Sequence, residues 1–326
     1  MKVIETTGIK QLSKLCPGGV VSIGNFDGIH IGHRKILETA NNIARRTKKP
    51  FHLVTFEPHP AAVLNPENNP GTITPLNVKT AILSSYGVDN LIIFSKSLEV
   101  LEMEPEDFVT QFIEKKAAAS VVVEGHDFNF GRSRRGDVAL LRALSGKKGF
   151  EVLEVEPQLV RCTDNTQVRV SSSLIRKFLL EGRVKDVCLG LGRRYSLFGR
   201  VVSGKGKGKK LGFPTLNMAP PEQIIPREGV YAGYVKTGSE DNPVNISGDY
   251  VPAAISIGTA RTYGKGNPLL VEAHILHESP PEETQSMVID FLQRIRDQRH
   301  FDSEQQLAAQ ISEDCAVMRE LTASGI

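Results

Sequence analysis

The sequence predicts two parts of different fold class, an N-terminal α/β part built on a parallel sheet and a C-terminal small antiparallel β-barrel with a terminal helix. The chain has 326 residues, which is long for one compact core. From residue 20 to about 180, short apolar runs alternate with amphipathic helical segments. After Gly182 the chain instead has strand-like runs separated by Gly, Pro, Asn and Asp, with no long amphipathic helix among them.

In the first part, four short apolar runs can each be buried on both faces, as parallel strands are. These expected strands are residues 20–26, 51–56, 91–94 and 121–124. Thr74 and Pro75 predict an N-cap and first-turn proline for a helix that Gly87 ends, and Pro105 opens another helix. Ligands of such sheets bind beyond the carboxyl ends of the strands.

In the second part, the strand-like runs are residues 195–202, 230–235, 251–257 and 269–276, which indicate a compact antiparallel sheet or barrel. Ser303, followed by Glu304, Gln305 and Gln306, matches a capping box and predicts the start of the terminal helix. We expect the boundary near residues 184–192, with domains of residues 1–186 and 187–326.

Composition excludes several classes of protein. The net charge is 40 − 37 = +3, so no global field favours nucleic acid. No apolar run approaches the length of a membrane span and no secretory signal opens the chain. The four cysteines lie far apart without a C-x-x-C pair. We therefore expect a cytoplasmic protein with reduced cysteines and no zinc site. We expect it to act on small molecules, and the sequence leaves its oligomeric state open.

The most informative segment reads Gly24-Asn25-Phe26-Asp27-Gly28-Ile29-His30-Ile31-Gly32-His33. It follows an apolar run and precedes a stripe of apolar residues at helical spacing from Ile36 to Ala44, so it predicts strand, loop and helix. His30 and His33 can share one face of the first helical turn, where free N–H groups and the helix dipole favour an anion, and Gly32 lets that anion approach the backbone. The alternative is a turn with two solvated histidines.

A second phosphate candidate is Ser171-Ser172-Ser173-Leu174-Ile175-Arg176, at the mouth of a helix that ends at Gly182. Its hydroxyl and N–H groups could hold phosphate oxygens, and Arg176 could neutralise a pyrophosphate leaving group. A plain serine cap with a surface arginine is the alternative.

Two further segments follow the second and fourth expected strands and so belong at the ligand edge of the sheet. They are Thr55-Phe56-Glu57-Pro58-His59-Pro60 and Gly125-His126-Asp127-Phe128-Asn129-Phe130-Gly131. Ordinary turns explain their prolines and Gly131, but leave His59, Asp127 and Asn129 unexplained.

In the second part, residues 204–210 form a Gly/Lys-rich stretch whose N–H groups could wrap a triphosphate, although a solvated linker is the alternative. It is not a Walker A sequence. The segment Leu211-Gly212-Phe213-Pro214-Thr215-Leu216-Asn217 then presents two oxygen side chains after a proline turn. Glu272 lies on an expected strand of alternating apolar and polar residues, on the face opposite to Val271, Ala273 and Ile275. A lone glutamate in such a position usually faces solvent.

Taken in order, these motifs resemble the bacterial bifunctional riboflavin kinase/FMN adenylyltransferases over nearly the whole chain. The segment 24–33 resembles the site of the H-x-G-H nucleotidyltransferases, and 170–176 is similar to their second motif, Ile-Ser-Ser-Thr-x-x-Arg, with Val170 and Ser173 in place of Ile and Thr. Residues 211–217 resemble the riboflavin kinase signature, in which the Thr and Asn oxygens hold the magnesium of ATP.

The resemblance implies a Rossmann-like nucleotidyltransferase sheet and a riboflavin kinase-like barrel, with ATP, riboflavin and FMN as substrates and Mg²⁺ as cofactor. For adenylylation it implies catalytic His30, His33 and Arg176, ATP contacts from Gly24, Asn25, Phe26, Gly32, Ser171 and Ser172, and flavin or nucleotide contacts from His59, Asp127 and Asn129. For phosphorylation it implies ATP contacts from Gly206, Gly208, Lys209 and Gly212, metal ligands Thr215 and Asn217, and the catalytic base Glu272.

The chain departs from the family in its second part. The usual Asn-Ile-Gly-x-x-Pro-Thr is here Ser256-Ile257-Gly258-Thr259-Ala260-Arg261-Thr262, and a Tyr-Gly pair is absent around residues 283–286. A monofunctional FMN adenylyltransferase with a degenerate flavin-binding barrel is therefore an alternative. A flavin carrier that consumes no ATP and a nucleic-acid-binding protein that relies on the loop lysines are two others.

Overall fold

The computed structural model describes residues 1–204, 207–239, 249–259, 269–276 and 284–323. By internal contacts the chain divides into two compact units, Met1–Val160 with Gln167–Ser172, and Arg161–Thr166 with Ser173–Ile326. The last break between the two units lies between Ser172 and Ser173, ahead of the expected domain boundary. The boundary between residues 186 and 187 stays a prediction.

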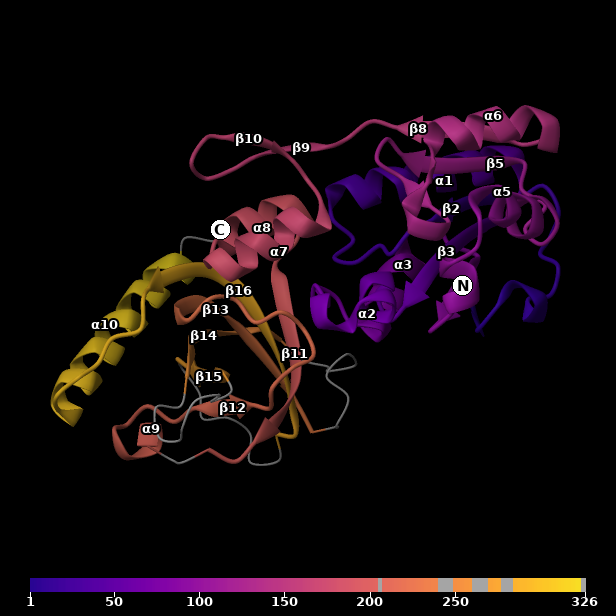
Figure 1. The fold of residues 1–326 in the computed structure, drawn as a ribbon. Helices are drawn as coiled ribbons and strands as arrows, with labels where there is room; N and C mark the ends of the chain where they lie inside the picture. The colour runs from indigo at the N-terminus through magenta and orange to yellow at the C-terminus, as the bar shows by residue number, and fades with distance from the viewer. Residues whose placement is uncertain (205–206, 240–248, 260–268, 277–283, 324–326) are drawn as a thin grey trace. The chain divides into compact units, whose positions relative to one another are not determined.

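The first unit is built on a six-stranded parallel sheet with strand order β1-β4-β3-β2-β5-β8 (Figure 1). Its strands are β1 (Lys2–Thr6), β2 (Val20–Ile23), β3 (Phe51–Glu57), β4 (Asn90–Ser95), β5 (Val121–Gly125) and β8 (Glu151–Val155). The four predicted strands are confirmed, except that the first ends at Ile23 and not at residue 26, and the edge strands β1 and β8 were not predicted.

Helices join these strands and cover both faces of the sheet. They are α1 (Ile31–Thr47), α2 (Pro60–Leu64), α3 (Leu76–Ser85), α4 (Leu98–Leu101), α5 (Pro105–Phe108), the π-helical turn η3 (Val109–Glu114) and α6 (Val138–Lys148). The predicted start at Pro105 is confirmed. The predicted N-cap at Thr74 is wrong by one residue, because Pro75 occupies the N-cap position and caps with no side chain.

Alternation along the strands divides the apolar core of this unit into two layers. Val20 and Leu53 pack with Leu37 of α1 and Leu83 of α3 on one face. On the other face, Val21, Ile23 and Val54 pack with Phe108, Phe112 and Leu141 from α5, η3 and α6. Both faces being buried explains why the strands are short continuous apolar runs.

The remaining elements before the barrel are short. They are β6 (Asn129–Phe130), β7 (Gly136–Asp137), β9 (Leu159–Arg161), β10 (Gln167–Arg169), α7 (Ser172–Glu181) and α8 (Val184–Leu191), with 3₁₀ turns at Ile9–Gln11, Pro66–Asn68 and Arg132–Arg134.

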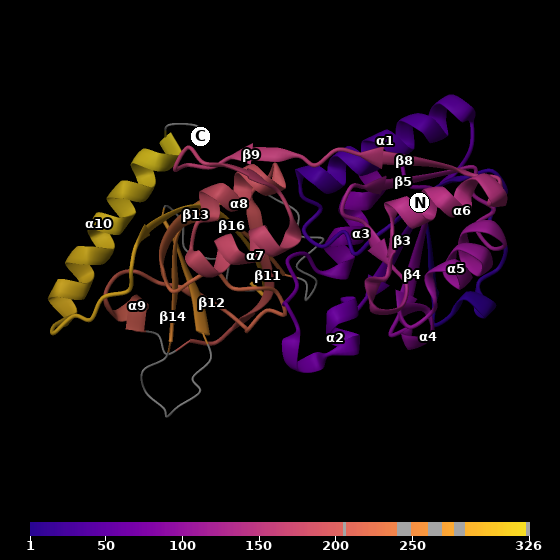
Figure 2. The same ribbon diagram turned by 45° about the horizontal axis from the view of Figure 1, so that its top comes forward.

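The second unit contains a closed antiparallel barrel of order β11-β12-β15-β14-β13-β16 (Figure 2). Its elements are β11 (Tyr195–Val202), α9 (Lys207–Lys210), β12 (Leu216–Met218), β13 (Gly229–Gly238), β14 (Val251–Thr259), β15 (Leu269–Ile275), β16 (Ser286–Arg296) and α10 (Glu304–Ala323). The predicted barrel is confirmed, and β12 and β16 were not among the predicted strands.

The terminal helix α10 begins where the sequence predicts. The Ser303 hydroxyl accepts a hydrogen bond from Gln306 N–H at 3.2 Å, and the Gln306 side chain accepts one from Asp302 N–H at 3.2 Å. The reciprocal contact thus reaches one residue further back than in a regular capping box. Among the described residues, no helix combines the length and the apolar character that crossing a membrane requires.

Candidate functional site

The loop between β2 and α1 is a tight, buried turn at the carboxyl end of the central strand. Phe26, Gly28 and Ile29 have positive φ values of 47°, 86° and 42°, and Phe26 and Ile29 are fully buried. Gly24 N–H donates to the carbonyl of Val54 at 3.0 Å, which fixes the start of the loop to β3. Non-glycine residues with positive φ are held only where packing determines them, and such strain gathers at functional sites.

The two histidines of the loop lie together at the start of α1. His30 is the N-cap, and its Nδ1 accepts a hydrogen bond from His33 N–H at 3.2 Å. The two rings stack with centroids 3.7 Å apart, and Phe26 packs against His33 at 5.1 Å. A Cβ at Gly32 would approach the His30 ring to 3.1 Å, so this position needs a glycine or a shift of the ring. The structure therefore brings both predicted histidines to one helix N-terminus, where the dipole favours anions.

The second predicted phosphate motif touches this loop directly. Ser172 Oγ donates to the carbonyl of Asp27 at 2.8 Å. The Asp27 carboxylate accepts hydrogen bonds from the N–H groups of Ile73 and Thr74 at 3.0 to 3.1 Å, so it anchors the loop to the segment before α3. Ser171 immediately precedes the helix, and Arg176 lies four residues after Ser172 on α7, on the same helical face, and is 8% exposed.

The residues predicted to touch flavin or nucleotide fall into two groups. His59 caps α2 by accepting from Ala61 N–H at 3.1 Å, and its Nε2 lies 3.1 Å from Asn25 Nδ2 in the loop. Asp127 is exposed and pairs with Arg169 at 2.5 Å, while Asn129 Nδ2 donates to the Asp127 carbonyl at 2.6 Å. His59 thus joins the loop, whereas Asp127 and Asn129 form their own exposed turn after β5.

Sequence reasoning missed two buried charged residues beside the loop. Glu124, at the end of β5, is 2% exposed, and Lys79 of α3 is 4% exposed. Lys79, Asn25, Glu57 and His59 line a small hollow together with Asp27, Phe56 and Thr72. Glu124 could have been found from the sequence, because it ends an apolar run that is expected to be buried on both faces. Lys79 lies on a short helix, and nothing in the sequence indicates that it is buried.

In the barrel, Glu272 lies between two polar residues on neighbouring strands. It is the direct cross-strand partner of Asn217 on β12 and of Ser256 on β14. Val271, Ala273 and Ile275 are buried on the opposite face of β15, as the alternation predicts. Burial raises the pKa of the Glu272 carboxyl, because a low-dielectric environment disfavours the charged form.

The surroundings of Glu272 offer oxygen atoms suited to a magnesium ion. The Asn217 amide packs directly against Gly204, since a Cβ there would lie 2.2 Å from Asn217 Nδ2, so this position needs a glycine. Thr215 precedes Asn217 by two residues, which on extended backbone places both side chains on one face. Amide, hydroxyl and carboxylate oxygens are the donors that Mg²⁺ takes, usually few in number when phosphates complete its shell. These residues therefore fit the implied ion.

The predicted phosphate loop of the barrel is only partly described. Gly208 accepts hydrogen bonds from Leu211 and Phe213 N–H at 3.1 and 2.8 Å, and its missing side chain leaves room for the Phe213 carbonyl. Lys209 is exposed, and Gly212 has a φ of 85°. The predicted residue Gly206 lies outside the described residues, as do two positions of the family departures, residues 261 and 283.

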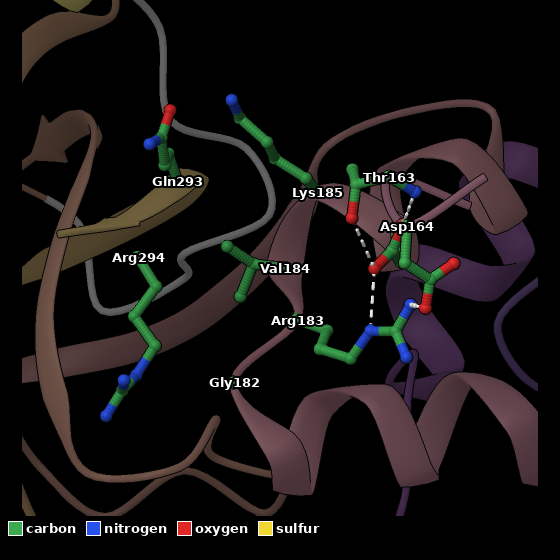
Figure 3. Close-up of a pocket in the computed structure, with 9 residues that line it drawn as sticks. Thr163, Asp164, Gly182, Arg183, Val184, Lys185, Gln293 and Arg294 are labelled. Atoms are coloured by element: carbon green, nitrogen blue, oxygen red, sulfur yellow. Dashed lines mark hydrogen bonds and ion pairs between the residues drawn. The ribbon is translucent and has the colours of Figure 1, made fainter. Parts of the chain in front are cut away.

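A larger pocket of the second unit carries none of the predicted site residues (Figure 3). Arg183 donates to Asp186 at 2.7 Å and to Asp164 at 3.0 Å, and Thr163 donates to Asp186 through both its N–H and its hydroxyl. These contacts hold the 161–166 turn to the start of α8.

Comparison with known proteins assigns a family to each part of the chain. The sequence model of FAD synthetase matches residues 13–174, and that of riboflavin kinase matches residues 191–322. Bifunctional riboflavin kinase/FMN adenylyltransferases from Buchnera aphidicola (subsp. Schizaphis graminum) and Escherichia coli K12 are each 30% identical over 321 residues. The alignments cover 98% of this chain and 98% and 97% of those proteins.

A solved structure shares the whole fold. The crystal structure of a chain described as a macrolide-efflux protein from Streptococcus pneumoniae has a TM-score of 0.83 and 27% identity, and the match covers 98% of this chain and 99% of that one. The match includes residues of both parts of the chain.

Proposed function

The chain belongs to the bifunctional riboflavin kinase/FMN adenylyltransferases, and from this premise we propose which residues carry each of its two reactions. The enzyme phosphorylates riboflavin to FMN with ATP and then transfers AMP from ATP to FMN, which yields FAD and pyrophosphate. The reading of the chain as an adenylyltransferase with a degenerate barrel is thereby set aside.

Adenylylation is assigned to the loop of residues 24–33 and to Ser171, Ser172 and Arg176. An oxygen of the FMN phosphate attacks the α-phosphorus of ATP, and the bond to the bridging oxygen breaks to release pyrophosphate. The nucleophile is already anionic, so the reaction needs positioning and charge stabilisation rather than a strong base. The stacked His30 and His33 at the start of α1 support this role, because they lie together at a helix N-terminus, where the helix dipole favours an anion.

The remaining predicted residues of this site have supporting roles in the proposal. Gly24, Asn25, Phe26 and Gly32 give the loop the close backbone approach that a triphosphate requires. His59, Asp127 and Asn129 contact the flavin or the nucleotide. His59 Nε2 lies 3.1 Å from Asn25 Nδ2, and this contact with the loop supports the proposed role of His59.

Phosphorylation is assigned to the barrel, with Glu272 as general base. Its carboxylate takes the proton of the ribityl 5′-hydroxyl as that oxygen attacks the γ-phosphorus of ATP, and the bond to the β-phosphate oxygen breaks to release ADP. The raised pKa of Glu272 supports this role, because burial makes the carboxylate a stronger base than an exposed glutamate. Gly206, Gly208, Lys209 and Gly212 would hold the ATP phosphates.

Thr215 and Asn217 would hold the Mg²⁺ ion. When bound, this ion offsets the negative charge of the ATP phosphates. The position of Asn217 opposite Glu272 supports the assignment, because it sets the metal ligand beside the proposed base.

One observation gives this division of the two reactions its main support. The chain has two separate sites, each built from polar residues at the edge or face of its own sheet. Supplying riboflavin, ATP and Mg²⁺ and separating the products by chromatography tests it. His30→Ala should accumulate FMN, whereas Glu272→Gln should make no FMN but still convert added FMN to FAD. If both variants block the same step, the division of labour is wrong.

We also propose that the enzyme works in the cytoplasm on small molecules, without nucleic-acid partners. The four cysteines Cys16, Cys162, Cys188 and Cys315 are all free thiols, as a reducing compartment maintains them. Both the substrates and the local rather than global positive charge support this proposal.

A further inference from the structure

A buried carboxyl group holds the backbone at the start of the adenylylation loop. Strands β2 and β5 pair only at Val20 with Val121 and at Val21 with Val122. Beyond that point, Glu124 Oε1 accepts a hydrogen bond from Ile23 N–H at 2.6 Å. The Glu124 side chain therefore supplies the acceptor that the neighbouring strand no longer offers, immediately before Gly24.

A buried ammonium group holds the same loop from the other side. Lys79 Nζ donates to the carbonyl of Asn25 at 3.3 Å and pairs with Glu57 at 3.4 Å, and the Lys79 side chain is 5% exposed. The Thr55 hydroxyl donates to the same Asn25 carbonyl at 3.1 Å. Lysine is almost never fully buried unless it is paired, so this placement has a cost that the pairing with Glu57 and Asn25 must offset.

The two side chains act on backbone groups that flank Gly24. Glu124 holds the N–H of Ile23, and Lys79 holds the carbonyl of Asn25. The Lys79 bond has a charged donor, and such hydrogen bonds are stronger than those between neutral groups, whereas the Glu124 bond satisfies a backbone N–H that would otherwise be buried without an acceptor. Burial raises the pKa of Glu124 well above its ordinary value, which favours the uncharged carboxyl and so avoids a buried negative charge behind a phosphate site.

We propose that Glu124 and Lys79 are positioning residues for adenylylation, which hold the backbone of the 24–30 loop without contacting substrate themselves. The inference rests on the assignment of this loop to adenylylation. In-line transfer requires the reacting atoms to be placed closely, and a displacement of about 1 Å can lower the rate on the order of a hundredfold. A loop with several positive φ values persists only where the surrounding structure holds it, and the contacts of Glu124 and Lys79 are part of that support.

The test uses the full-length enzyme, whose riboflavin kinase activity is an internal control. Glu124→Leu and Lys79→Met remove the hydrogen-bonding groups, whereas Glu124→Gln keeps a carbonyl acceptor and Lys79→Arg keeps a charged donor. Glu38→Leu and Lys147→Met, at exposed positions on α1 and α6, are the matched controls. For each variant, kcat and KM are measured for FMN adenylylation and for riboflavin phosphorylation.

We expect Glu124→Leu and Lys79→Met to lower the adenylylation kcat about tenfold to a hundredfold, with a smaller change in KM for FMN, while phosphorylation stays unchanged. Glu124→Gln and Lys79→Arg should restore most of the rate. Wild-type adenylylation in Glu124→Leu and Lys79→Met would overturn the proposal, as would an equal loss of both activities. Should Glu124→Leu fail to fold, the difference between Lys79→Met and Lys79→Arg decides.

A parallel His30→Ala enzyme separates the two levels of the argument. If His30→Ala adenylylates FMN normally, the assignment of the loop is wrong and the inference falls with it. If His30→Ala loses adenylylation while Glu124→Leu and Lys79→Met keep it, the loop assignment stands and only the positioning role is overturned.

Discussion

Replacing Glu272 by glutamine should remove riboflavin phosphorylation and leave FMN adenylylation intact. The amide matches the carboxylate in shape, so the cross-strand pairs with Asn217 and Ser256 can persist. Only the capacity to accept a proton is lost. General base catalysis contributes about a hundredfold to ten-thousandfold, which corresponds to roughly 2.7 to 5.4 kcal/mol in activation free energy.

The pH dependence of the wild-type enzyme tests the same role independently. Only the ionised carboxylate accepts a proton, and burial raises the pKa of Glu272. The kcat of phosphorylation should therefore rise with pH, with a midpoint above the value of about 4.3 for an unperturbed glutamate. Any residual phosphorylation by Glu272→Gln should lack this rise.

The assay follows FMN and FAD by chromatography at saturating riboflavin, ATP and Mg²⁺. Glu222→Gln, at an exposed position of the same unit, is the control and should behave as wild type. Adding FMN in place of riboflavin checks that the Glu272→Gln enzyme is folded and still adenylylates. A Glu272→Gln enzyme that phosphorylates riboflavin as fast as wild type would refute the base assignment.

His30→Ala or His33→Ala should slow adenylylation on the order of a hundredfold or more, by loss of transition-state stabilisation, with phosphorylation retained; equal loss of both reactions would contradict this. Asn217→Ala should raise the Mg²⁺ concentration needed for half-maximal phosphorylation and leave adenylylation unchanged. A fragment of residues 1–186 should convert FMN to FAD, and a folded but inactive fragment would refute separable domains. Burial raises the pKa of Glu124 in the folded state, so the stability that the protonated carboxyl contributes is present at acid pH and is lost as pH rises through the folded pKa. The Tm of Glu124→Gln relative to wild type should therefore increase with pH, and a Tm difference that does not change with pH would contradict burial as the cause of the raised pKa.

The sequence predicts the central strands and the barrel because their burial leaves a regular pattern. The strands it misses are those whose pattern is weak. β8 alternates exposed Glu151 with half-buried Val152 at the edge of the sheet, and β12 has only three residues. β16 pairs with β13 through register shifts at Val230 and Ala232, and such irregularities break the period of two that identifies a strand.

The candidate site was predictable where a residue acts through its position in a short motif. His30 and His33 lie three residues apart on one helical turn, so local geometry alone brings them together. Glu124 and Lys79 reach the loop from β5 and α3, and their contacts with Ile23 and Asn25 exist only after the sheet forms. No local pattern encodes such distant contacts.

Desolvation raises the pKa of both Glu124 and Glu272, yet we propose different roles for the two carboxyls. Glu124 is 2% exposed and its oxygen is already bound to Ile23 N–H, so no substrate hydroxyl can reach it. Glu272 is half-buried between two polar residues on the less buried face of its strand, where a hydroxyl can approach. Access therefore distinguishes a base from a positioning group, because a base must lie within hydrogen-bond reach of the proton that it removes.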